Sequence, residues 1–121
     1  MRPITNQEMK SLLDDLMKSC EDWVEAIVII SEEGAPIMHS MCIDLEPDYI
    51  AVASSAILGS ASAVLELLNS RGFDSIDVRL KEGRYLLVRR YEDYYLAALT
   101  RPEPNLGFIS LALEAYLPSR R

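Results

Sequence analysis

The stretch VEAIVIISEEGAPIMHSMCI, residues 24–43, decides the fold of this chain. Residues 24–30 are almost continuously apolar and rich in β-branched side chains, which predicts a central strand covered on both faces. The SEEGAP segment that follows is typical of a turn, because Gly34 tolerates a positive φ. Residues 37–43 resume an extended pattern, so the whole stretch predicts a β-hairpin.

Segments outside this hairpin predict three helices. A capping box that begins at Thr5 precedes an amphipathic helix over residues 6–21. Pro47 suits the first turn of a long apolar helix that ends near residue 69. Asn105 can cap a final helix.

Three further strands are expected between the middle and last helices. Residues 76–80 alternate apolar and polar side chains, and residues 85–91 and 94–100 follow around a tight turn. The order is α-β-β-α-β-β-β-α, and the chain is a single α+β domain, residues 1–121, with one five-stranded antiparallel sheet. Because the first strand is apolar on both faces, we expect the middle helix on one face and the terminal helices on the other.

Composition and charge narrow the function. Of 121 residues, half are hydrophobic and 26% are charged, which is typical of a globular domain. The net charge of −7 argues against nucleic acid as a partner. Residues 1–50 carry three basic and eleven acidic side chains, so we expect one acidic end. Whether the basic group further along forms a second binding surface is left open: Arg79, Arg84, Arg89 and Arg90.

The cysteines and the longest apolar stretch bear on location. Cys20 and Cys42 lie inside apolar patterns without paired spacing, which favours a reducing, cytoplasmic compartment. The stretch from Ile50 to Leu68 is interrupted by Ser, Gly and one Glu, so we expect no direct membrane insertion.

No catalytic, cofactor or metal site is predicted. His39 is the only histidine, and nothing in the sequence places a nucleophile or carboxylate beside it. His39 and Cys42 supply at most two metal ligands. The glycines are isolated, so no phosphate-binding loop is expected.

The middle helix carries two apolar stripes. The first is expected to pack on the sheet: Ile50, Ala53, Ile57, Ala61, Val64 and Leu68. The second contains small residues, would be exposed in a monomer and predicts a contact with another helix: Ala51, Ser55, Leu58, Gly59, Ser62 and Leu65. The alternative is a helix buried on two sides within one chain.

The third strand is the other predicted interface. If it lies at the sheet edge, pairing with its own copy would use its free backbone groups. A two-fold axis near Val78 would place Asp77 opposite Arg79 of the second copy, with Ile76 alongside. The alternative is an edge protected by its own charges.

The chain resembles the roadblock (dynein light chain) family, which in prokaryotes includes the gliding-motility regulator of a Ras-like GTPase. The resemblance covers nearly the whole chain. It depends on these segments: Val28-Ile29-Ile30-Ser31, Glu33-Gly34-Ala35-Pro36-Ile37, the helix from Ile50 to Leu68, Gly83 leading into Tyr85-Leu86-Leu87-Val88, and Asn105-Leu106-Gly107.

The resemblance implies a homodimer in which third strands join two sheets and the middle helices pair. It also implies a non-catalytic regulator or scaffold of a small Ras-like GTPase, docked on those helices at Ser55, Leu58, Gly59, Ser62 and Glu66. The helix contains no Arg or Lys, so we expect GTPase activation by switch stabilisation, or scaffolding, rather than an arginine supplied in trans.

Two alternatives remain. One is an assembly subunit of a motor or membrane-associated complex without GTPase activation. The other is a small-molecule sensor, for which the sequence shows no polar residues converging on a pocket between sheet and helix.

Overall fold

The structure is a computed structural model that describes residues 3–117. Three helices and five strands follow the predicted order. The elements are α1 (Asn6–Ser19), β1 (Val24–Ile30), β2 (Pro36–Met41), α2 (Pro47–Leu67), β3 (Ser75–Arg79), β4 (Tyr85–Tyr91), β5 (Tyr94–Thr100) and α3 (Leu106–Tyr116). The bounds of β1, β4 and β5 match the prediction, whereas β2 ends two residues early.

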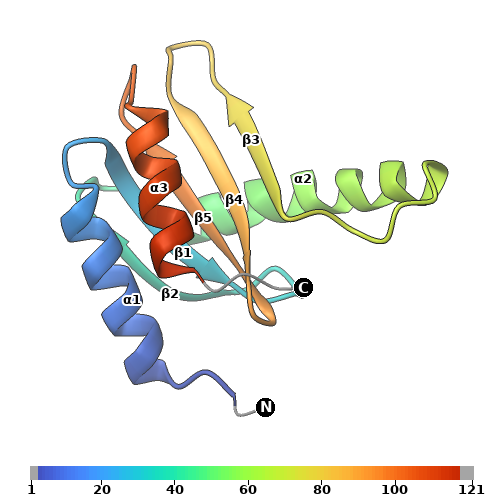
Figure 1. Ribbon diagram of the computed structural model, residues 1–121, viewed down its shortest axis with the longest axis horizontal. Helices are drawn as coiled ribbons and strands as arrows, with labels where there is room; N and C mark the ends of the chain where they lie inside the picture. The colour runs from blue at the N-terminus through green and yellow to red at the C-terminus, as the bar shows by residue number, and fades with distance from the viewer. Residues whose placement is uncertain (1–2, 118–121) are drawn as a thin grey trace.

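All five strands form one antiparallel sheet in the order β2-β1-β5-β4-β3 (Figure 1). β1 lies inside the sheet between β2 and β5. β2 and β3 are the two edge strands, so β3 meets the condition on which its predicted pairing with a second copy depends.

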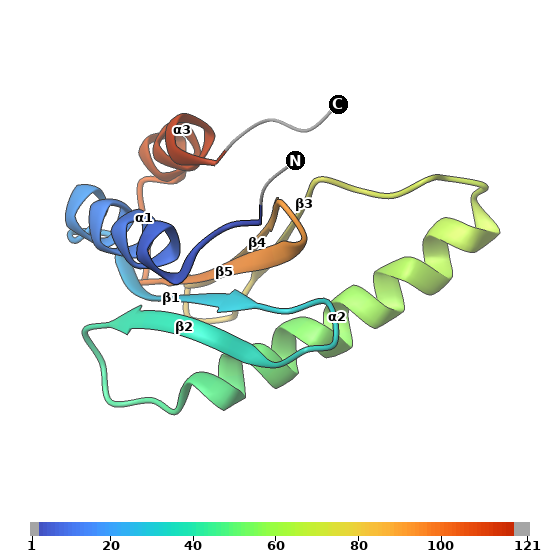
Figure 2. The ribbon, with the colours of Figure 1, turned by 90° about the horizontal axis from the view of Figure 1, so that it is seen from below.

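The helices cover the two faces of the sheet as expected. Figure 2 shows α1 and α3 above the sheet and α2 below it. β1 serves both layers: Ile27 and Ile29 belong to the core under α1 and α3, and Val28 and Ile30 to the core over α2. This double burial explains why its sequence is almost continuously apolar.

Local signals set the ends of the elements. The Thr5 hydroxyl accepts the Glu8 backbone N–H at 3.1 Å, which confirms the N-cap half of the predicted capping box. The Asn105 side chain likewise accepts the Phe108 N–H at 3.0 Å and starts α3. Gly34 has a φ of +96° in the turn between β1 and β2, as that turn requires.

Candidate functional site

α2 is longer than the sheet beneath which it lies. Its buried residues are Ile50, Ala51 and Ser54, all in the first two turns and a half. This part packs chiefly on β1, β2 and β5. The rest of the helix continues past the β3 edge and ends beyond the sheet (Figure 1). We call this second part, residues 57–68, the overhang.

The overhang keeps an apolar side toward the plane of the sheet. Leu58, Ala61 and Leu65 continue the buried line of the helix at spacings of three or four residues, yet each is only half-buried. Leu68 at its end is 69% exposed. Ile57 and Leu58, at its start, still pack against the core between α2 and the sheet, whereas Ala61 and Leu65 do not belong to that core.

A second apolar line runs along the outer face of α2, away from the sheet. Its members are all exposed and recur every three or four residues: Tyr49, Val52, Ala56, Ser60, Ala63 and Leu67. Tyr49, Val52 and Leu67 are 65%, 67% and 87% exposed. We call this line the outer stripe. Contiguous apolar surface of this kind marks an interaction site in soluble proteins.

By length and composition alone, α2 also meets the requirements of a membrane-spanning helix; it is the one described helix that does. Its first part is held against the sheet by Ile50, Ala51 and Ser54. The apolar character of α2 therefore has a function in this fold, since one side builds the core.

The predicted facing of α2 is partly wrong. Ala51, which we expected to be exposed, is fully buried, whereas Ala53, Val64 and Leu68, expected on the sheet, are exposed. The buried line runs between the two predicted stripes because the small side chains of Ala51 and Ser54 let the helix approach its own sheet closely.

The other predicted interface residues of α2 lie in different surroundings. Leu58 and Leu65 are half-buried on the overhang, and Gly59, Ser62 and Glu66 are exposed. Ser55 contacts the chain's own hairpin: a Cβ added at Gly34 would lie 2.6 Å from the Ser55 Oγ. A small residue at position 55 therefore accommodates the β1–β2 turn.

β3 presents its backbone at the opposite edge from β2. The Leu80 N–H donates to the Arg84 carbonyl at 2.8 Å, so even-numbered residues bond inward to β4. By alternation, Asp77 and Arg79 turn their backbone groups outward. Ile76 and Val78 are half-buried against the α2 layer, whereas Asp77 and Arg79 are exposed.

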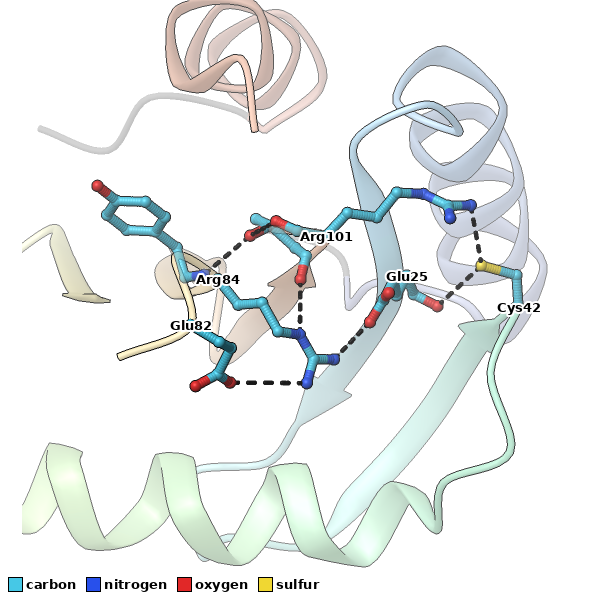
Figure 3. Close-up of polar contacts among 7 residues, drawn as sticks. Glu25, Cys42, Glu82, Arg84 and Arg101 are labelled. Atoms are coloured by element: carbon cyan, nitrogen blue, oxygen red, sulfur yellow. Dashed lines mark hydrogen bonds and ion pairs between the residues drawn. The ribbon is translucent and has the colours of Figure 1, made fainter. Parts of the chain in front are cut away.

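Carboxylates neutralise most of the basic group. Arg84 pairs with Glu25, contacts Glu82 at 3.9 Å and donates to the Thr100 carbonyl, joining β4, β5 and β1 (Figure 3). Two further ion pairs are Arg89 with Asp77 at 2.6 Å and Arg90 with Glu32 at 3.2 Å. Arg79 alone of the four has no ion pair with a described residue. The arginines therefore build structure and do not gather into one basic surface.

The structure contains little that could support chemistry. His39 is exposed on β2. Within residues 3–117, no three His, Cys, Asp or Glu side chains are placed to hold a metal ion. Burial raises the pKa of the Cys20 thiol, while Cys42 is exposed.

A hollow of about 690 Å³ beside the overhang was not foreseen. Its lining includes Glu66, Arg71, Phe73, Arg90 and Tyr95. Arg90 is already held by Glu32 and by the Tyr95 hydroxyl at 2.7 Å, and its guanidinium stacks on the Tyr95 ring. Polar side chains thus do converge beside α2, against the prediction, and those of Arg90 and Tyr95 bind each other.

The sequence reasoning missed the outer stripe. Its signal was present, since residues 49, 52, 56, 60, 63 and 67 have regular helical spacing. Three overlapping apolar lines on one helix cannot be ranked from spacing alone.

A model of the Roadblock/LC7 domain matches residues 9–100. The fold is similar to that of Myxococcus xanthus MglB, with 12% sequence identity and a TM-score of 0.82 over 96% of this chain and 86% of that one. The fold is also similar to that of the gliding protein MglB from Thermus thermophilus, with 14% sequence identity and a TM-score of 0.78 over 96% of this chain and 87% of that one. A Roadblock/LC7 domain from Streptomyces avermitilis has 16% sequence identity and a TM-score of 0.72 over 88% of each chain. No curated protein sequence gives a significant match.

Proposed function

Because this chain belongs to the Roadblock/LC7 domain family, we propose that it is a homodimeric regulator or scaffold of a small Ras-like GTPase. It acts in the cytoplasm and performs no catalysis of its own. The exposed apolar length of α2 carries this proposal, since one side of the overhang needs a sheet and the outer stripe needs a partner. The similarity to MglB gliding proteins supports a regulatory role.

The overhang supports the dimer. A second copy that continues the sheet through β3 would place its own β3 and β4 over the overhang, where this chain has no strand. Leu58, Ala61 and Leu65 of each copy would then complete a core. Burial of apolar surface stabilises an interface by roughly 25 cal/mol per Å². We therefore propose that the contact between each overhang and the sheet of the second copy contributes most of the free energy of dimerisation.

The outward groups of β3 are compatible with the same arrangement. An axis near Val78 pairs Asp77 with Arg79 of the second copy, and both residues turn their backbone groups outward. The Asp77 carboxylate would then be shared, because it already binds Arg89.

The outer stripe supports GTPase docking. It faces away from the sheet, so joining two sheets at β3 leaves it open, and two copies would present one wide apolar surface. Gly59 and Glu66 lie beside it along the helix. α2 contains neither Arg nor Lys. We therefore propose that the dimer holds the switch segments of the GTPase in position, or only recruits it, and supplies no arginine.

Light scattering tests the dimer. The wild type is expected at twice the mass of one chain. Leu65→Glu places a charge on the sheet-facing side of the overhang and should yield folded monomers, whereas Leu67→Glu alters the outer stripe and should remain dimeric. A monomeric wild type, or a Leu65→Glu variant that stays dimeric, would contradict the proposed dimer.

Binding of a Ras-like GTPase tests the docking surface. The probe is a small Ras-like GTPase, loaded with a non-hydrolysable GTP analogue or with GDP. The wild-type dimer should prefer the GTP form, and Leu67→Glu should weaken binding at least tenfold while leaving the mass unchanged. Equal binding of the wild type and Leu67→Glu would exclude the outer stripe as the platform.

A further inference from the structure

The β2 edge exposes unpaired backbone groups. The Cys42 N–H donates to the Glu25 carbonyl of β1 at 2.9 Å. In the β1–β2 register, Ser40 and Met38 share this inward orientation. By alternation, His39 and Met41 turn their N–H and C=O groups away from the sheet, where an added strand could bond them.

This edge has little protection. Its sequence, PIMHSM, contains no charged side chain, its only proline stands at the first position, and the register shift against β1 leaves its bulge at Ile37, near the start of the strand. Natural edge strands usually carry charges, prolines or bulges that discourage pairing. β3 carries Asp77 and Arg79, so the two edges differ in how well they are protected.

Acidic side chains surround β2. A hollow of about 500 Å³ between α1 and the end of β2 is lined by Asp14, Glu21 and Asp22, together with Lys18 and Arg101. Neither Glu21 nor Asp22 forms an ion pair with any residue from 3 to 117. The turn before β2 adds Glu32 and Glu33, and the loop after it adds Asp44 and Glu46. Asp14 also pairs with Lys10 at 3.4 Å and Glu32 with Arg90 at 3.2 Å, but carboxylates still outnumber the basic side chains around this edge.

This charge decides which strand can pair with β2. A second copy paired there would bring the same carboxylates together from both sides, and like charges oppose association. We propose that the β2 edge binds an extended lysine- or arginine-rich segment of a partner protein as an added strand. The backbone supplies the hydrogen bonds, and the acids select basic side chains.

The sheet geometry gives the segment its pattern. Met38 and Ser40 belong to the face that α1 covers, and His39 and Met41 to the face of α2. Side chains of an added strand alternate in the same way. Basic residues at every second position would therefore lie on the α1 side, near Asp14, Glu21 and Asp22. This site lies at the opposite edge of the sheet from β3. It is additional to the proposed docking surface for a GTPase.

The test uses the full chain and an acetylated, amidated heptapeptide of alternating threonine and lysine. Its control is the same peptide with glutamate in place of lysine. On binding, the backbone amides of His39 and Met41 should shift in NMR spectra and become protected from hydrogen exchange. The glutamate peptide should not bind. Shifts scattered over the acidic surface without amide protection would overturn the added strand.

A matched pair of variants separates strand addition from simple charge attraction. His39→Pro removes an outward N–H and leaves the inward bonds to β1 intact, whereas His39→Ala keeps that N–H. His39→Pro should weaken peptide binding at least tenfold relative to His39→Ala. Equal binding of the two would overturn the proposal.

A charge-reversing variant, Glu21→Lys with Asp22→Lys, should also weaken binding at least tenfold. Unchanged binding would show that Glu21 and Asp22 do not contribute to the peptide site. The mass of every sample is measured in parallel, so a failure here is distinguished from a failure of the β3 dimer.

Discussion

The two edge strands of the sheet offer the same backbone groups but lie in different surroundings. β3 carries Asp77 and Arg79, and the overhang of α2 extends beyond it. β2 is uncharged, lies beside α1 and is surrounded by carboxylates. An edge accompanied by an uncovered apolar helix favours a second copy, because only another sheet covers that helix. An edge with an excess of carboxylates around it disfavours its own copy and favours a basic partner.

The largest expected effect tests the assignment of inward and outward groups on β2. Ser40→Pro removes an inward N–H from the β1 ladder and should lower the free energy of unfolding by about 3 kcal/mol or more. His39→Pro, one residue away, should change it by less than about 1 kcal/mol. Urea unfolding of both variants checks this. A larger loss for His39→Pro would show that the inward and outward residues are reversed, and equal losses would contradict the assignment.

The next effect concerns β3. Arg79→Pro removes an outward N–H and leaves the bonds to β4 intact, whereas Arg79→Ala keeps the N–H. By symmetry, a dimer loses two hydrogen bonds, each contributing about 1 kcal/mol, so its dissociation constant should rise at least about tenfold. Sedimentation at several concentrations measures it. If Arg79→Ala weakens the dimer as much as Arg79→Pro, the side chain and not the backbone forms the contact.

The smallest effect lies between the edges, where α2 packs under β1. Ser54 is fully buried, and its hydroxyl has no hydrogen-bond partner among residues 3–117. Ser54→Ala removes this unsatisfied group and improves helix propensity, so the free energy of unfolding should rise by about 1 kcal/mol. Thermal unfolding measures the change. Peptide binding at β2 and the mass of the dimer should stay as in the wild type, since neither edge contains Ser54.

Much of the fold could be predicted because its signals are local. β1 is apolar without interruption, and β4 and β5 are joined by a two-residue turn, so their bounds match the prediction. Thr5 and Asn105 start their helices through contacts within three residues. The alternation of polar side chains along β3 predicted one exposed face, whereas its position at the sheet edge is a property of the strand order.

The interface residues of α2 were predicted less well. α2 is apolar on nearly every side, so its periodicity could not select the face that packs on the sheet. The contact of Ser55 with Gly34 joins residues far apart in the chain and left no pattern to detect. The acidic end was expected from the charge of residues 1–50, but its position beside an unprotected edge depends on the order of the strands.

The sequence by itself determined which segments are helices and strands, where they begin, and that one half of the chain is acidic. These properties depend on interactions within a few residues, which spacing and composition record. Only the tertiary structure decided how α2 is rotated, that its second part extends past β3, and that β2 forms the acidic edge. Those properties depend on packing between segments far apart in the chain. Ala51 and Ser54 are small enough for α2 to pack closely on the sheet, but no local sequence pattern specifies which strands it contacts.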